Sequence, residues 1–209
     1  MRLAIFGAGG MGRELADIAK RSTQMPLVFV VDEPDHLEVQ GVPLIAPHDL
    51  EPDDLLVIAL GSSGARKTVA ERFSDRRFGS LVASSAIVAP SASLGEGAQI
   101  CDFVAINNLV RIGRHFQANL FAQVSHDCVI GDYVTFSPRA TCNGTVHIGD
   151  GVFVGAGAII RNGSPGRPLS IGEGATIGMG AVVTGDVPPG ATVFGVPARE
   201  ADDPRAVAN

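Results

Sequence analysis

The sequence contains no tryptophan, and aromatic residues make up only 5% of its 209 residues. Charged residues reach 18%, whereas glycine occurs 26 times. This composition suits tightly stacked backbone better than a bundle filled with large side chains. A chain of this length can bury a core either as one large domain or as two small ones.

Four further absences narrow the class of protein. The formal net charge is −6 and the pI is near 5.3, so a broad basic surface for nucleic acid is not expected. No run of 18 apolar residues occurs, so no membrane span is expected. Cys101, Cys128 and Cys142 have no CxxC spacing and are odd in number, which favours reduced, cytoplasmic thiols. The opening "MRLAIFGAGG" has no small-residue cleavage site, and we interpret it as mature sequence.

Residues 1–80 alternate strand-like and helix-like segments. Residues 3–22, "LAIFGAGGMGRELADIAKRS", predict a buried strand, a glycine turn and a helix. Residues 26–32, "PLVFVVD", predict a second strand, and residues 53–73, "DDLLVIALGSSGARKTVAERF", predict a third strand, a turn and a helix. Such alternation favours a parallel sheet covered by helices, here a small Rossmann-like βαβαβ domain.

The pattern changes near residue 87, beyond which an apolar residue recurs at every sixth position. All thirteen of these positions from Val88 to Ile160 are apolar, which chance gives in roughly one register per thirty thousand at 45% apolar content. The period resumes at Ile171 after five extra residues. Hexapeptide repeats predict a parallel β-helix, in which three hexapeptides form one triangular coil. We therefore expect a β-helix domain over residues 81–199 and a tail over 200–209.

The first glycine loop, "GAGGMG" at residues 7–12, follows a strand and begins a helix. It matches G-x-G-x-x-G, and Asp32 ends the second strand 20 residues beyond Gly12. Backbone N–H groups at a helix start favour phosphate, and an acid at the second strand end suits a ribose or base edge. The alternative is a glycine turn that serves only close packing of strand and helix.

The α/β portion has room for only one nucleotide-binding half. A full dinucleotide domain and a separate oxidoreductase substrate domain are both missing, so a mononucleotide, such as the nucleotide end of a sugar donor, fits better. Gly61, Ser62 and Arg66, in "GSSGARK" after the third strand, are candidate contacts to it. A solvated position in the first helical turn is an equal alternative for Arg66.

His126 and Asp127 interrupt a repeat that otherwise needs only small and apolar residues. The period of 18 places Asn108, His126, Gly144 and Asn162 in one column, with coils about 4.8 Å apart. The histidine therefore has a glycine one coil above it, where backbone can approach a ligand closely. Asp127 can orient the imidazole as a general base. The alternative is a surface histidine with a chance acidic neighbour.

A metal site is the competing interpretation, because some β-helix enzymes are zinc carbonic anhydrases. Their ligand spacing includes His-x4-His, and Ile130 and Gly131 occupy the positions where a partner of His126 would be needed. The histidines share no column of the repeat: His36, His48, His115, His126 and His147. We therefore expect no metal.

Both halves together resemble one bacterial family over residues 1–199. The most specific stretches are "HDCVIGDYVTFSPRATCNG" at 126–144 and "IGMGAVVTGDVPPGATVFGVPAR" at 177–199. The family comprises nucleotide-aminosugar N-acetyltransferases of bacillosamine and perosamine type and related sialic acid O-acetyltransferases, within the hexapeptide-repeat superfamily. The resemblance implies a left-handed β-helix, against the usual crossover rule. It also implies acetyl-CoA as donor and a homotrimer with active sites between neighbouring solenoids.

The resemblance assigns roles to individual residues. It implies that His126 is the catalytic base, that Asp127 supports it, and that the Gly144 N–H holds the thioester oxygen. It places Asn119 near the acceptor sugar. It places Gly144, Gly155 and Ala156 beside the CoA arm, and Arg199 at the CoA phosphates. The residues implied at the nucleotide sugar are Gly9, Gly10, Met11 and Asp32.

Three departures from the family pattern bear on the substrate. Met11 stands where some relatives have the histidine of "GGHG", and Thr135 stands where some have a second histidine. Both positions lie close to the acceptor in those relatives, so the sugar here can differ. The five extra residues within 161–170, near Arg161 and Arg167, either shape the CoA channel or form a tolerated loop at a solenoid corner.

These observations lead to one hypothesis and two alternatives. The hypothesis is an acetyl-CoA-dependent N-acetyltransferase that acts on the 4-amino group of a nucleotide-linked 4-amino-4,6-dideoxysugar. The first alternative is O-acetylation of sialic acid or a related sugar. The second is a trimeric nucleotide-sugar-binding protein without catalysis.

Overall fold

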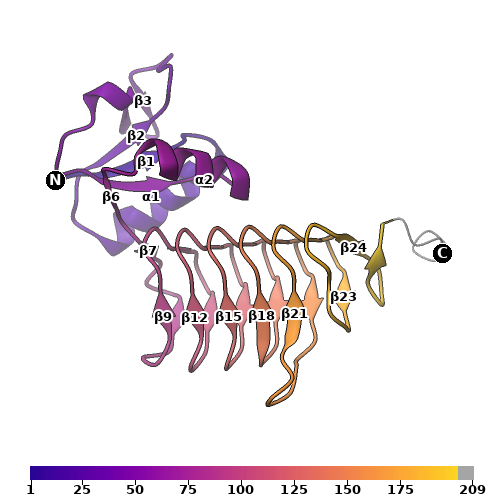
Figure 1. Ribbon diagram of the computed structural model, residues 1–209. Helices are drawn as coiled ribbons and strands as arrows, with labels where there is room; N and C mark the ends of the chain where they lie inside the picture. The colour runs from indigo at the N-terminus through magenta and orange to yellow at the C-terminus, as the bar shows by residue number, and fades with distance from the viewer. Residues whose placement is uncertain (202–209) are drawn as a thin grey trace.

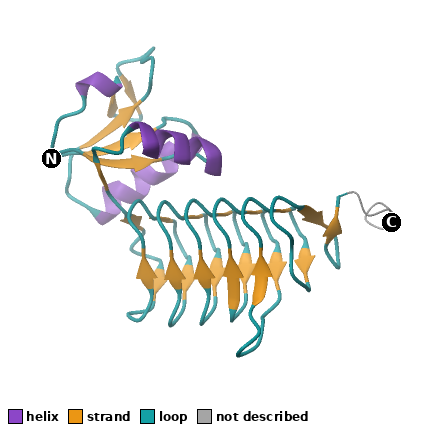
Figure 2. Cartoon of the chain, viewed as in Figure 1, coloured by secondary structure: helices purple, strands orange, loops and turns teal. Residues whose placement is uncertain are grey.

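The computed structural model describes residues 1–201 and shows two parts, an α/β unit and a long three-sided prism (Figures 1 and 2). The α/β unit lies at one end of the prism, and the last described strands lie at the other (Figure 1). Residues 202–209, most of the predicted tail, lie outside the described residues. Within residues 1–201, no helix is long and apolar enough to cross a membrane.

The α/β unit is built on a sheet with strand order β3-β4-β2-β1-β5-β6. Its elements are β1 (Leu3–Phe6), α1 (Gly10–Ser22), β2 (Leu27–Val30), β3 (Glu38–Val39), β4 (Val42–Ile45), the 3-10 helix η1 (Pro47–Asp49), β5 (Leu55–Ile58), α2 (Ser63–Arg72) and β6 (Arg77–Phe78). All neighbours pair in parallel except β3 with β4. The sequence predicts β1, β2, β5 and both helices. It misses β3, β4 and β6, which lack a long apolar run.

The predicted nucleotide-binding segments all lie at the carboxyl edge of this sheet. The glycine loop follows β1, Asp32 follows β2, and Gly61 and Ser62 follow β5. Strand β1 lies between β2 and β5, so the chain runs from β1 to one side for β2 and β4 and then returns to the other side for β5. Ligands of open α/β sheets bind at such a switch point.

The second part is a parallel β-helix with three flat faces. The first face contains β7 (Leu81–Val82), β10 (Gln99–Ile100), β13 (Gln117–Ala118), β16 (Thr135–Phe136), β19 (Phe153–Val154), β22 (Thr176–Ile177), β24 (Thr192–Phe194) and β25 (Arg199–Glu200). The second contains β8 (Ile87–Val88), β11 (Ala105–Ile106), β14 (Gln123–Val124), β17 (Thr141–Cys142), β20 (Ile159–Ile160) and β23 (Val182–Val183). The third contains β9 (Ser93–Leu94), β12 (Arg111–Ile112), β15 (Val129–Ile130), β18 (Val146–Ile148) and β21 (Leu169–Ile171).

The register of the coils follows the predicted period of 18. Val124 pairs with Cys142, for example, and the inward residues of the repeat are at most 6% exposed from Ile100 to Ile160. Ile148 instead pairs with Ile171, which locates the five extra residues between β20 and β21. Glu200 and Ala201, assigned to the tail from the sequence, are bonded to β24. The predicted combination of an α/β unit and a hexapeptide β-helix is confirmed.

The α/β unit packs on the part of the first face formed by β10, β13 and β16, through a buried polar contact. Gln99, Gln117 and Thr135 point outward from this face, yet each is at most 1% exposed. Gln99 donates to the carbonyl of Ile58 at 2.6 Å, and Gln117 donates to Gln99 at 3.0 Å. Because the side chains of Gln99, Gln117 and Thr135 all have hydrogen-bond partners, the contact fixes how the two parts meet.

Arg66 is the centre of this contact and is 0% exposed. Its guanidinium donates to the carbonyls of Leu60, Gly61, His115, Tyr133 and Val134 and to the side chains of Gln117 and Thr135. Burial lowers the pKa of Arg66 to about 10, so it stays charged at neutral pH. The structure therefore corrects both sequence-based interpretations, since Arg66 is neither a nucleotide contact nor a solvated residue.

We expect Arg66→Met to destabilise the protein by about 3–5 kcal/mol, because several buried carbonyls would lose a charged donor. In a chain of this size the loss corresponds to a fall in Tm of about 10 °C. Thermal unfolding followed by circular dichroism tests this, with Arg77→Met, at an exposed position of β6, as control. Equal Tm values for the two variants would contradict a stabilising role of Arg66 in the contact between the two parts.

Candidate active site

His126 lies at the edge between the second and third faces, which we call the His126 edge. Its Nδ1 is 2.8 Å from Asp127 Oδ2, and the two side chains are 57% and 49% exposed. A Cβ added to Gly144 would lie 2.5 Å from His126 Cε1 and 2.6 Å from Nε2. The imidazole therefore packs directly on the Gly144 backbone, the neighbour that the period of 18 predicts.

The turn that carries the pair is held by the coils on either side. The Asp127 N–H donates to the Asn108 carbonyl at 3.2 Å, and the Thr145 N–H donates to the His126 carbonyl at 2.9 Å. Asp127 has φ 59°, in the left-handed region. Aspartate and asparagine tolerate this conformation better than most residues. The backbone therefore presents the two side chains in a fixed relation.

Two groups at this site are free to act on a ligand. A carboxylate accepts hydrogen bonds, so Asp127 favours the tautomer with hydrogen on Nδ1, which leaves Nε2 of His126 as the proton acceptor. Neither Nε2 nor the Gly144 N–H has a hydrogen-bond partner among residues 1–201. They adjoin a cavity of about 370 Å³ lined by Ser125, His126, Asp127, Asn143, Gly144, Thr145, Asn162, Gly163 and Pro165.

We expect Asp127→Asn to lower kcat by about 10²-fold, within the range that general-base catalysis supplies. The asparagine amide can donate to Nδ1 and so favour the tautomer that carries hydrogen on Nε2. Asparagine also tolerates the φ of 59° at this turn, so the backbone is retained. Steady-state kinetics of Asp127→Asn against Asp75→Asn, at an exposed position remote from the site, measure the effect. Equal kcat values for the two variants would mean that Asp127 has no role in catalysis.

Three predicted site residues lie at another edge of the same chain. Asn119, Gly155 and Ala156 occupy turns between the first and second faces, and none lines the His126 cavity. The Asn119 side chain donates to the Phe136 carbonyl at 3.1 Å, and the Gly155 N–H donates to the Ile177 carbonyl at 2.8 Å. A single chain therefore does not bring these residues to His126.

The glycines of the first loop divide into two kinds. Gly7 has φ 104°, and a Cβ at Gly12 would meet the Gly7 carbonyl oxygen, so these two serve the close packing of strand and helix. Gly9 and Gly10 are exposed, and a Cβ added to either meets nothing within 4 Å. The first turn of α1 contains no acidic residue, which leaves its N–H groups suited to an anion.

The other predicted nucleotide contacts already have partners within the chain. Met11 is half-buried and packs against the hydrophobic core. The Asp32 carboxylate is 2.6 Å from the Arg72 guanidinium, and Ser62 Oγ accepts the Ala65 N–H at 3.3 Å. Thr135, which the sequence predicts to lie near the acceptor, belongs to the Arg66 contact.

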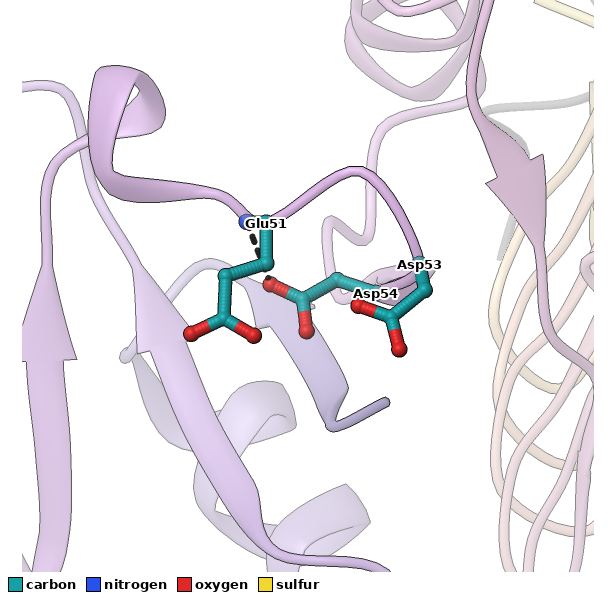
Figure 3. A group of neighbouring side chains, drawn as sticks. All are labelled: Glu51, Asp53 and Asp54. Atoms are coloured by element: carbon teal, nitrogen blue, oxygen red, sulfur yellow. Dashed lines mark hydrogen bonds between the residues drawn. The ribbon is translucent and has the colours of Figure 1, made fainter.

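The described residues contain one cluster with metal-like spacing, and it includes no histidine. Glu51, Asp53 and Asp54 place carboxylate oxygens within 4.8 Å of one another (Figure 3). The Arg2 guanidinium lies 2.6 Å from Asp54, and the Met1 nitrogen lies 2.7 Å from Asp53. These cations balance the charge of the cluster.

The β-helix, with its His–Asp pair over an unpaired backbone N–H, is typical of an acyltransferase of the hexapeptide-repeat class. Residues 2–73 match the family described as the PglD N-terminal domain. The chain is 41% identical over 208 residues to the GDP-perosamine N-acetyltransferase of Escherichia coli O157:H7, covering 94% of each chain. The chain therefore belongs to the hexapeptide-repeat sugar acetyltransferase family, and it is an acetyltransferase.

Two solved structures have the same two-part fold. The acetyltransferase domain of PglB from Neisseria gonorrhoeae FA1090, in complex with acetyl coenzyme A, has a TM-score of 0.88 and 31% identity, covering 95% of this chain and 98% of that one. PerB from Caulobacter crescentus, in complex with CoA and GDP-perosamine, has a TM-score of 0.82 and 29% identity, covering 96% and 97%. The predicted left-handed β-helix is confirmed by this similarity.

Proposed function

We propose that this acetyltransferase transfers the acetyl group of acetyl-CoA to the 4-amino group of a nucleotide-linked 4-amino-4,6-dideoxysugar. The observation that carries the proposal is the cavity in which Nε2 of His126 and the unpaired Gly144 N–H lie side by side. The names of two relatives specify GDP-perosamine, so the GDP-linked amine is the first acceptor to test.

In the proposed reaction, the neutral sugar amine attacks the thioester carbonyl carbon. Nε2 of His126 takes a proton from the attacking nitrogen, a step worth about 10² to 10⁴ in rate. The Gly144 N–H donates to the oxyanion of the tetrahedral intermediate, worth about 10² to 10³ by comparison with other oxyanion donors. Collapse of the intermediate breaks the carbon–sulfur bond, and the departing CoA thiolate takes up a proton.

The proposed site includes a second copy of the chain. The glycine loop belongs to the unit that covers the first face, whereas His126 lies at the opposite edge of the prism. A sugar held by the loop of one copy would therefore meet His126 of its neighbour. The homotrimer that the family resemblance implies supplies such neighbours, and it would also bring Asn119, Gly155 and Ala156 to the site. Light scattering on the purified chain gives the oligomeric state, and a monomer at assay concentration would contradict this arrangement.

We infer a cytoplasmic location from the thiols and the substrates.

The decisive experiment measures CoA-thiol release from acetyl-CoA with 4-amino-4,6-dideoxysugars linked to GDP, UDP and dTDP, and with sialic acid as a hydroxyl acceptor. Turnover on one amine supports the proposal and identifies the nucleotide. Turnover on sialic acid alone would replace it with O-acetylation. No turnover with any acceptor would contradict the proposed substrate class and leave only a binding role.

A further inference from the structure

Three adjoining cavities follow the His126 edge toward the carboxyl end of the prism. The first, about 370 Å³, contains His126, and it shares Asn162 and Gly163 with a second of about 580 Å³. The second shares residues 184–186 with a third of about 440 Å³, which Arg199 lines. We call this series of three adjoining cavities, which begins at His126, the groove.

The five extra residues form a hairpin that lines the second cavity of this groove. Ser164 and Arg167 are bonded to each other in both directions, at 3.1 and 2.9 Å, and the loop before β21 projects beyond the neighbouring turns (Figure 1). Its base is tied to the catalytic coil, because the Gly163 N–H donates to the Gly144 carbonyl at 3.0 Å. Asp186 secures the other side by accepting the Ser170 N–H at 2.8 Å. The hairpin is thus held firmly beside the site.

Arg161 and Arg167 both line the second cavity and are exposed. Within the part of the chain that the structure describes, neither guanidinium has a hydrogen-bond or ion-pair partner. Seven other arginines do have one, namely Arg2, Arg13, Arg21, Arg66, Arg72, Arg76 and Arg114. Asp186, the carboxylate of this cavity, is bonded to backbone instead. Two unpaired cations thus meet at one cavity of a protein whose net charge is −6.

We propose that Arg161 and Arg167 bind the phosphate groups of the CoA donor and so contribute to recognition of acetyl-CoA. This inference rests on the proposed function. A donor whose thioester lies at Gly144 carries its pyrophosphate and 3′-phosphate at the far end of the pantetheine arm, and the groove leads from Gly144 past both arginines. The planar guanidinium suits phosphate in bidentate geometry. The hairpin is therefore a donor-recognition element of this chain, and Arg199 lies beyond it in the third cavity.

A phosphate-free donor separates this role from a general structural one. We expect Arg161→Met/Arg167→Met to raise KM for acetyl-CoA about 10- to 100-fold, the size expected for loss of charge-assisted hydrogen bonds. The KM for S-acetylpantetheine, which lacks those phosphates, should not change, and neither should kcat. Arg77→Met again serves as the control. Equal rises in KM for both donors, or no rise for either, would overturn the assignment.

Titration calorimetry with CoA distinguishes failure of this inference from failure of the proposed function. A wild-type protein that binds CoA but acetylates no aminosugar contradicts the proposed acceptor alone. The double variant should still bind CoA 10- to 100-fold more weakly, and added salt should weaken CoA binding to the wild type more than to the variant. Equal affinities in wild type and double variant would overturn the arginine assignment, whatever the acceptor.

Discussion

Replacement of His126 by alanine should lower kcat by about 10²-fold or more while the fold is retained. The side chain is exposed and makes its one side-chain hydrogen bond within the described residues to Asp127, so its removal leaves no buried group without a partner. A sugar amine is already partly deprotonated near neutral pH, which puts the loss at the lower end of the range for general-base catalysis. A hydroxyl acceptor would depend more strongly on the base.

The His126→Ala result is read from kcat with the best aminosugar acceptor, at saturating acetyl-CoA. His48→Ala is the matched control, because His48 is exposed and lies in the α/β unit. Circular dichroism and CoA affinity should match the wild type. A loss below about tenfold would count against an essential base at this position. Catalysis would then depend on the Gly144 N–H without a base at His126.

The repeat could be predicted from the sequence because its determinants are local. Each inward position recurs after six residues, so Ile100, Ile106 and Cys142 are buried as the pattern predicts. The same period gives the vertical neighbours, which is why the contact of His126 with Gly144 follows from counting. The same period places Asn119 and Gly155 in one column and His126 in another. The sequence therefore already indicated that Asn119 and Gly155 lie at a different edge of the prism from His126 of the same chain.

The contact between the two parts could not be predicted, because it depends on a packing that no local pattern encodes. Gln99, Gln117 and Thr135 occupy outward positions, where the repeat predicts exposure, and docking of the α/β unit buries them. Arg66 lies in the first turns of a helix, where a charged residue is ordinarily solvated. Its burial becomes visible only when α2 is placed against the first face.

The position of the hairpin within 161–170 also could not be predicted from the sequence. Its length could be read from the interrupted period, but the sequence left open whether it shapes the CoA channel or is a tolerated loop. The bond from Gly163 to Gly144 decides where it lies, and a Cβ at Gly163 would meet the Thr145 carbonyl oxygen. Asn162, Gly163 and Pro165 thus join the cavity of His126. Asn162 could have been found from its column, whereas Pro165 could not.

The second large effect is expected from Gly144→Ala, which should lower kcat by about 10²-fold with little change in Tm. The added Cβ would lie 2.5 Å from His126 Cε1 and 2.6 Å from Nε2, closer than van der Waals contact allows. Because the imidazole is more than half exposed, it can rotate away without disturbing the core. That rotation breaks its bond with Asp127 and moves Nε2 from the attacking amine. Gly64→Ala in α2 is the control, since an added Cβ there meets only Ser62 Oγ, at 4.0 Å.

Gly144→Ala also separates the two roles proposed for this glycine. Alanine keeps the backbone N–H that would hold the oxyanion, so the expected loss reports on the displaced histidine. If the substitution acts through His126, the double variant Gly144→Ala/His126→Ala should have nearly the same kcat as His126→Ala. If the two losses in kcat instead multiply in the double variant, Gly144 acts independently of His126, through the position of its N–H or the entry of the thioester. Wild-type kcat in Gly144→Ala would mean that the imidazole need not lie against this backbone, and the geometric basis for the proposed base would fail.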